Sequence, residues 1–292
     1  MLPDELTKSL ESTLTSERGQ KVKITDTCPI GGGCINEAHL VHTDSGRFFI
    51  KYNSSSAFPG MFEKESEGLN LLAETKTIDV PEVIATGETG KYAYLLLQFV
   101  ESGTKKSDFW SDFGTRLAAL HQHSAENFGF KHDNYIGSLT QSNLPHPDFI
   151  SFFIGQRIGP QLKTARDKGE INQGDIKYFE SLFKKLPNIF PPEKPALVHG
   201  DLWSGNLMVS ANGLPCLVDP AVYYGNREAD IAMTELFGGF RPDFYDAYNH
   251  SFPMEKGWQK RMDILNLYPL LVHVNLFGGG YAGQVIRIIR QF

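Results

Sequence analysis

One stretch of the chain reads His199-Gly200-Asp201-Leu202-Trp203-Ser204-Gly205-Asn206, and Asp219 follows thirteen residues after Asn206. Phosphoryl transfer needs a carboxylate beside the attacking hydroxyl. It also needs an amide oxygen and a second carboxylate to hold the Mg²⁺ ions that bridge the phosphates. Asp201, Asn206 and Asp219 supply these three groups in that order. A single Asp or Asn in a turn is usually a capping residue, so the prediction rests on the spacing of the three together.

This spacing matches the catalytic loop of protein kinases, H-R-D-L-x-x-x-N, with Gly200 in place of the arginine. That arginine contacts a phosphorylated activation loop in protein kinases. Here only about ten residues separate Asp219 from Asp230 on the next predicted helix, which leaves no room for a long activation segment. The pattern therefore predicts a kinase of small molecules, with Asp201 as the catalytic base and with Asn206 and Asp219 as Mg²⁺ ligands.

The first hundred residues carry the candidates for nucleotide binding. Lys51 ends a predicted strand, where a kinase lysine reaches the α- and β-phosphates of ATP. Glu65 on the following helix is its expected partner, and Glu63 and Glu67 are alternatives. A glycine-rich turn between the first two strands lets backbone N–H groups approach the phosphates closely. The expected nucleotide contacts are Gly31, Gly32, Gly33, Cys34, Asn36, Lys51, Glu65, Gln98, Phe99 and Val100.

Hydrophobic periodicity predicts an α+β fold of two lobes, similar to that of protein kinases. We expect a nucleotide-binding lobe at residues 1–101 and a catalytic and substrate-binding lobe at 102–292. The first lobe is predicted to hold an antiparallel sheet and helices that begin after Pro3 and span 61–74, with an edge strand at 80–88. The second is predicted to be mostly helical, with helices at 109–124, 148–168, 173–186, 228–237, 261–277 and 284–290, a long loop at 127–144, a strand at 196–199 and a hairpin at 207–218.

Composition narrows the class of protein. The formal net charge of -6 argues against a nucleic-acid partner, because phosphate backbones are bound by clustered Lys and Arg. The start of the chain lacks the features of a signal peptide, and the longest apolar run, 92–97, is too short to span a membrane. Three cysteines without paired spacing fit a reducing compartment. We therefore expect a cytoplasmic protein without a nucleic-acid or membrane partner.

Together these residues resemble the fructosamine kinase family, which is related to the aminoglycoside and choline phosphotransferases. The matching stretches are 31–36, 61–69, 134–137, 199–206, 224–240 and 276–281. The resemblance implies ATP and Mg²⁺ as cofactors. It also implies phosphorylation of the 3-hydroxyl of ketosamines, which are adducts of a sugar and an amine, either free or on glycated protein lysines. A phosphate at carbon 3 lies β to the carbonyl, so the product can eliminate phosphate and release the amine, which amounts to protein repair.

Four further residues have structural or binding interpretations. His199 is expected to lie under the loop and donate to a backbone carbonyl, and Asp230 is expected to bind N–H groups of the loop. Trp203 either packs in the core or stacks on the sugar-amine substrate. Cys34 either forms a redox switch that links two copies of the chain, a property to which the resemblance also points, or is simply a small residue tolerated in the turn.

Two other functions fit parts of the pattern. One is a kinase for an aminoglycoside or for choline, which the form of the loop with Trp203 and the block 227–240 disfavour. The other is a pseudokinase that only binds nucleotide, which is disfavoured by the presence of Lys51, Asp201, Asn206 and Asp219. The sequence leaves open whether fructose-, ribulose- or erythrulose-derived ketosamines are preferred, and whether the chain is a monomer or a redox-dependent homodimer.

Overall fold

The computed structural model describes residues 2–31 and 35–292, and the chain divides into two compact units. The first unit comprises Met1–Ser107 and Met208–Val218, and the second comprises Asp108–Leu207 and Asp219–Phe292. The division therefore falls after Ser107 rather than after residue 101, and the hairpin at 208–218 belongs to the first unit instead of the second.

Backbone hydrogen bonds explain why this hairpin joins the first unit. Its strands are β9 (Leu207–Val209) and β10 (Pro215–Leu217). Gly103 N donates to Val209 O at 3.0 Å, and Leu217 N donates to Asp79 O at 2.9 Å. These long-range bonds attach both strands to segments of the first unit, and a local sequence pattern carries no information about them.

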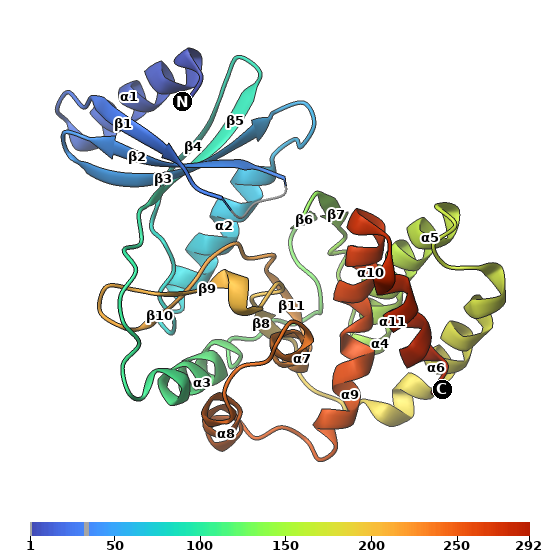
Figure 1. Ribbon diagram of the computed structural model, residues 1–292. Coiled ribbons are helices and arrows are strands. Elements are labelled where there is room, and N and C mark those ends of the chain that lie inside the picture. Colours follow the sequence, from blue (N-terminus) through green and yellow to red (C-terminus); the bar gives the residue numbers. More distant parts are fainter. Residues whose placement is uncertain (1, 32–34) are drawn as a thin grey trace. The chain divides into compact units, whose positions relative to one another are not determined.

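A five-stranded antiparallel sheet forms the base of the first unit, with strand order β1-β2-β3-β5-β4 (Figure 1). The strands are β1 (Ile24–Pro29), β2 (Glu37–Thr43), β3 (Gly46–Ser54), β4 (Val83–Thr89) and β5 (Tyr92–Gln98). β4 lies at one edge, as Pro81 just before it indicates, because proline cannot donate to a neighbouring strand. The predicted antiparallel sheet with an edge strand is confirmed.

Two helices cover opposite faces of this sheet (Figure 1). Successive side chains of a strand point to opposite faces. In β5, Ala93, Leu95 and Leu97 pack with α2 (Met61–Glu74), whereas Tyr94 and Leu96 pack with α1 (Asp4–Arg18). Because both faces of β5 are buried, its sequence is continuously apolar up to Leu97 rather than alternating.

The boundaries of α1 follow from its sequence. Leu6, Leu10 and Leu14 are fully buried, as their four-residue spacing predicts. The helix begins directly after Pro3 and ends at Gly19, which has a φ of 66°. This left-handed conformation is the usual end of a helix and suits glycine, which has no Cβ.

The second unit is mostly helical. Its α-helices are α3 (Phe109–Leu120), α4 (Phe149–Phe152), α5 (Gly159–Asp167), α6 (Ile176–Ile189), α7 (Glu228–Leu236), α8 (Pro242–Ser251), α9 (Trp258–Leu265), α10 (Leu267–Phe277) and α11 (Gly280–Ile289). Short helical turns are the π-helical η1 (Phe153–Ile158) and the 3-10 turns η2 (Gln173–Asp175) and η3 (Ser204–Asn206). Two antiparallel pairs are β6 (Asn134–Ile136) with β7 (Leu139–Gln141), and β8 (Ala196–Val198) with β11 (Tyr223–Gly225).

Two helical predictions need correction, and one helix was missed. The helix expected at 148–168 is interrupted by η1, and α5 restarts with Pro160 in its first turn, where a missing N–H costs nothing. The helix expected at 261–277 is divided at Asn266, whose side chain donates to Ala232 O. Helix α8 was not predicted. It packs closely on α3 because Gly114 has no Cβ, which would lie 2.2 Å from Phe244 O.

No helix within residues 2–31 and 35–292 is both long and apolar enough to cross a membrane.

Candidate active site

Asp230 on α7 holds the loop that follows β8. Its Oδ2 accepts a hydrogen bond from His199 N at 2.7 Å, and its Oδ1 accepts one from Gly200 N at 2.9 Å. The structural role expected for Asp230 is therefore confirmed. His199 is fully buried, and its Nδ1 accepts the N–H of Asp201 at 3.3 Å. This bond supports the loop, and the donation to a backbone carbonyl expected from sequence stays a prediction.

Two buried residues that the sequence did not reveal support Asp230 in turn. His121, just after α3, places Nε2 3.1 Å from Asp230 Oδ2, and its Nδ1 lies 2.8 Å from the hydroxyl of Tyr248 on α8. Burial alone would raise the pKa of Asp230. This pKa is nevertheless held below its usual value, because favourable contacts to the carboxylate outweigh burial. They are the hydrogen bond and charge of His121, the charge of His199 and the N–H of Gly200.

Glycine is required at position 200 because the backbone of Ala221 lies very close to it. Its φ is 83°, and a Cβ at this position would lie 2.1 Å from Ala221 O. Ala221 N also donates to His199 O at 2.9 Å. These contacts join the segment that carries Asp201 to the segment that carries Asp219, and they explain why glycine stands where protein kinases have arginine.

The hairpin β6–β7 fixes the segment after Asp219. Gln141 Nε2 donates to Ala221 O at 3.0 Å, and Asn134 Nδ2 donates to Val222 O at 2.8 Å. Gln141 Oε1 accepts a bond from the hydroxyl of Tyr268. The long polar stretch at 127–144 is thus ordered partly as a short hairpin, and it acts as a brace for the candidate site.

Asn206 holds the carboxylate of Asp201. Its Nδ2 donates to Asp201 O at 2.8 Å and to Asp201 Oδ2 at 3.0 Å, and its side chain is buried. Burial raises the pKa of Asp201 to about 7. The hydrogen bond from Asn206 opposes this rise, and the negative charges of Asp219 and Asp230 add to it. The three residues of the sequence pattern therefore interact in the structure: Asn206 is hydrogen-bonded to Asp201, and the charge of Asp219 acts on Asp201.

Asp219 has a φ of 56°. Within the described part of the chain, Lys76 is the only other non-glycine residue with a positive φ. Such a conformation costs about 1–3 kcal/mol and is concentrated at functional sites, where surrounding contacts impose it. The strain supports a specific role for this carboxylate.

Asn206 and Asp219 fit the requirements of a Mg²⁺ site. The amide nitrogen of Asn206 is bound to Asp201, so its amide oxygen is the atom that can act as a ligand. Mg²⁺ prefers such hard oxygen donors and binds through one or two carboxylates together with substrate phosphates.

In the first unit, Lys51 and Glu65 form a largely buried ion pair. Lys51 Nζ lies 2.7 Å from Glu65 Oε1, and their side chains are 8% and 13% exposed. The expected pairing of Lys51 with Glu65 is present, with Lys51 in β3 and Glu65 in α2. An ammonium group shielded in this way is held in one position, as a contact to phosphate requires.

The other expected nucleotide contacts are only partly described. Gly32, Gly33 and Cys34 lie outside the described residues, and the redox hypothesis for Cys34 stays a prediction. Gly31 is exposed, and Asn36 Oδ1 accepts a bond from the buried Asn53 at 2.9 Å. Three further candidates follow one another where β5 ends, with partly or fully exposed side chains: Gln98, Phe99 and Val100.

Trp203 is not a core residue. Its side chain is 36% exposed, its ring lies against Gly205 and makes an edge contact with Phe237 at 5.8 Å. A Cβ on Gly205 would lie 2.4 Å from this ring. Of the two roles expected for Trp203, packing in the core is therefore excluded. Stacking on the substrate stays a prediction, and the exposed ring two residues after Asp201 is compatible with it.

Comparisons with known sequences agree across almost the whole chain. The family model described as fructosamine kinase matches residues 6–292. A probable ketoamine kinase of Vibrio parahaemolyticus is 44% identical over 290 residues, covering 98% of this chain and 97% of that protein. A chloroplastic protein-ribulosamine 3-kinase of Arabidopsis thaliana is 40% identical over 283 residues, covering 94% and 84%.

Solved structures give the same result. The crystal structure of a fructosamine-3-kinase candidate from Haemophilus somnus 129PT matches with a TM-score of 0.89 and 31% identity, covering 97% of this chain and 96% of that one. An aminoglycoside phosphotransferase solved with AMP-PNP and hygromycin B matches with a TM-score of 0.63 at 14% identity, covering 97% and 98%. This second likeness concerns the fold alone.

Proposed function

Because this chain belongs to the fructosamine kinase family, we propose that it transfers the γ-phosphoryl group of ATP to the 3-hydroxyl of ketosamines. The observation that carries the proposal is the pairing of Asp201 with Asn206 at the end of β8, on a loop held by Asp230. Relatives that cover nearly all of the chain bear the names ketoamine kinase and protein-ribulosamine 3-kinase, which supports the choice of substrate class.

Asp201 is the proposed catalytic base. Its Oδ2 accepts a bond from Asn206, which fixes the plane of the carboxylate and directs Oδ1 to the substrate. In a phosphoryl transfer the protein mainly positions the reactants and stabilises charge. Asp201 orients the attacking 3-hydroxyl and takes up its proton as the bond to phosphorus forms.

Lys51, Asn206 and Asp219 are the proposed contacts to the nucleotide and its metal. Asn206 Oδ1 and the Asp219 carboxylate would hold Mg²⁺, which when bound neutralises charge on the phosphates. Lys51, held by Glu65, donates to the α- and β-phosphates of ATP. Backbone N–H groups of the glycine-rich turn at 31–36 are proposed to cover the phosphates.

Trp203 is the proposed contact to the sugar-amine part of the substrate. Its exposed ring is supported from one side by Phe237 and lies over Gly205, so its orientation is fixed. An indole face of this kind stacks on the apolar face of a sugar or on the alkyl chain of a lysine. The same contact would serve a free ketosamine or a glycated lysine on a protein surface.

A substrate panel tests this function. ATP consumption is measured with the fructose, ribulose and erythrulose adducts of lysine, and with an aminoglycoside and choline as controls. We expect turnover of at least one ketosamine. The three sugars differ in length by one hydroxymethylene group each, so kcat/KM should differ among the adducts by about 10–200-fold, the discrimination that a pocket achieves for one group of this size. Turnover of the aminoglycoside or of choline without turnover of any ketosamine would contradict the proposal.

A further inference from the structure

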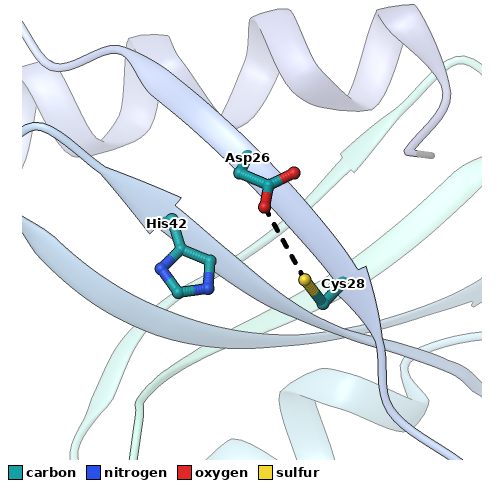
Figure 2. A group of neighbouring side chains, drawn as sticks. All are labelled: Asp26, Cys28 and His42. Atoms are coloured by element: carbon teal, nitrogen blue, oxygen red, sulfur yellow. Dashed lines mark hydrogen bonds between the residues drawn. The ribbon is translucent and has the colours of Figure 1, made fainter.

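Three side chains of kinds that bind metals converge on one face of the sheet in the first unit, and none of them was assigned a role above. Asp26 and Cys28 come from β1, and His42 comes from β2 (Figure 2). Asp26 is paired directly with His42 in the β1–β2 register, and Cys28 lies two residues further along β1. Because side chains alternate along a strand, this register brings all three to the same face.

The three ligand atoms lie close enough together for one cation to reach them all after small side-chain rotations. One atom from each residue lies within 4.8 Å of the other two, and Cys28 Sγ is 3.7 Å from Asp26 Oδ2. Zn–S and Zn–O bonds of standard length in a tetrahedron place sulfur and oxygen about 3.5 Å apart. The Cys28 and Asp26 side chains are exposed, so small rotations can close the remaining distances.

Neighbouring groups orient the cluster. Thr27 N donates to Asp26 Oδ1 at 2.8 Å, which turns Oδ2 towards the thiol. The nearest cation in the register is Arg47, which pairs with His42 from β3. Its guanidinium is bound to Glu101 and lies over the ring of Phe99, so its positive charge is directed to those groups rather than to the cluster.

We propose that Asp26, Cys28 and His42 form a binding site for a zinc-class divalent cation. Thiolate, imidazole and carboxylate together suit Zn²⁺ better than Mg²⁺ or Ca²⁺, which take oxygen ligands. Three protein ligands leave the fourth tetrahedral position to water. On binding, the thiol proton of Cys28 is released to solvent and the sulfur bonds to the metal as a thiolate.

The bound cation would join β1 to β2 on either side of the glycine-rich turn. The ligands lie on the same face of the sheet as Lys51, because Ala38, the partner of Lys51, is four residues from His42 in β2. A metal that binds the folded sheet and not the unfolded chain stabilises the fold. The site therefore predicts zinc-dependent stability that is independent of phosphoryl transfer.

The test is a Co²⁺ titration of the full chain with its thiols kept reduced. We expect a near-ultraviolet thiolate-to-cobalt band and the visible bands of tetrahedral Co²⁺, both removed by added Zn²⁺. The variant Cys28→Ser should lose the thiolate band, whereas Cys34→Ser and Cys216→Ser should keep it. Asp26→Asn and His42→Ala should each weaken Zn²⁺ binding at least tenfold in competition with a chelating dye.

Thermal unfolding provides a second readout and checks that the variants fold. Cys28→Ser should have the same Tm as the original chain without metal, because the side chain is exposed. Zn²⁺ should raise the Tm of the original chain but not that of Cys28→Ser. Absence of the thiolate band in the original chain would overturn the proposal. So would a band that persists in Cys28→Ser, or one that Cys34→Ser removes.

Discussion

Three aspartates in the candidate site are held in three different ways, and each way fits a different task. Asp201 is bound by a single side chain, Asn206, and keeps one oxygen for a substrate. Asp219 is placed by a left-handed backbone. Asp230 uses both oxygens on backbone N–H groups. A carboxylate whose oxygens are both occupied supports structure, whereas one with an available oxygen can act on a ligand.

Replacing Asp201 tests the proposed base. Asp201→Asn keeps the shape of the side chain and removes its capacity to accept a proton. We expect kcat to fall by about two to four orders of magnitude, the usual contribution of a general base, with nucleotide affinity retained. Steady-state kinetics with a ketosamine and calorimetry with MgATP measure the two quantities. A kcat close to that of the original chain would remove Asp201 from the mechanism.

Replacing Asp219 tests the proposed metal ligand. Asn tolerates the left-handed backbone of this position, so Asp219→Asn isolates the loss of charge from the effect of strain. We expect nucleotide binding to become insensitive to Mg²⁺, because the proposed link between metal and phosphates is weakened. Isothermal titration with ATP, with and without Mg²⁺, measures this. A Mg²⁺-dependent gain in affinity equal to that of the original chain would argue against the assignment.

Gly200 offers a test of the close contact with Ala221. Gly200→Ala adds a Cβ that would lie 2.1 Å from Ala221 O at a φ of 83°. We expect a loss of about 1–3 kcal/mol from overpacking in addition to the cost of the backbone conformation. Gly169→Ala is the matched control, since it has a φ of 77° but open space, and should cost only about 1–2 kcal/mol. Urea unfolding compares the two, and equal losses would show that the contact is unimportant.

At the scale of elements, sequence patterns correctly predicted the helices whose positions are determined by residues close together in the chain. The helices at 4–18 and 61–74 follow from leucine spacing, Pro3 and flanking glycines, and the structure has them at those positions. The division of α9 from α10 falls at Asn266, whose side chain donates to Ala232 O, a residue distant in the chain, and it lies just before Pro269, which has no N–H for Leu265 O. Helix α8 begins with Pro242, a residue that favours the first turn of a helix and so marks this start in the sequence.

The candidate site shows the same limit. Asp201, Asn206 and Asp219 were found because their chemistry imposes a fixed spacing within one short segment. His121 and Tyr248 were missed because they reach Asp230 through the fold, from α3 and α8. A clue was available for His121, which lies four residues after the buried Leu117 and so falls on the apolar face of the helix.

The hydrogen bonds from Tyr248 to His121 and from His121 to Asp230 predict that the free energy of unfolding depends on pH. Asp230→Asn should lower the free energy of unfolding by about 1–3 kcal/mol at neutral pH, because one loop N–H loses its acceptor. The pKa of Asp230 is lower in the folded chain than in the unfolded chain. Its carboxylate therefore stabilises the fold above the unfolded pKa, and this contribution is lost as the pH falls through the folded pKa.

Urea unfolding at neutral and acidic pH measures this effect. The control is Asp246→Asn on the exposed side of α8, which should change stability by less than about 0.5 kcal/mol. The difference between Asp230→Asn and the original chain should shrink at acidic pH. A difference that is absent at neutral pH, or that grows with acid, would contradict the role given to Asp230.

For the whole molecule, the path of the chain explains how the proposed nucleotide contacts and the proposed catalytic residues are distributed over the two units. Lys51 and Glu65 belong to the first unit, whereas Asp201, Asn206 and Asp219 belong to the second. The chain passes from the second unit into the hairpin of the first after Leu207 and returns at Asp219. Asn206 and Asp219 therefore stand at the two ends of one excursion, which explains their thirteen-residue spacing in the sequence.

The position of the transferred phosphate tests the central proposal most directly. The ketosamine that the chain turns over best is phosphorylated with ATP, and the product is analysed by phosphorus–proton correlation in NMR spectra. We predict coupling of phosphorus to the proton on carbon 3 of the sugar, followed by slow release of inorganic phosphate and free amine in a ratio near one. A phosphate on any other hydroxyl, or a product that never releases the amine, would contradict the proposed function.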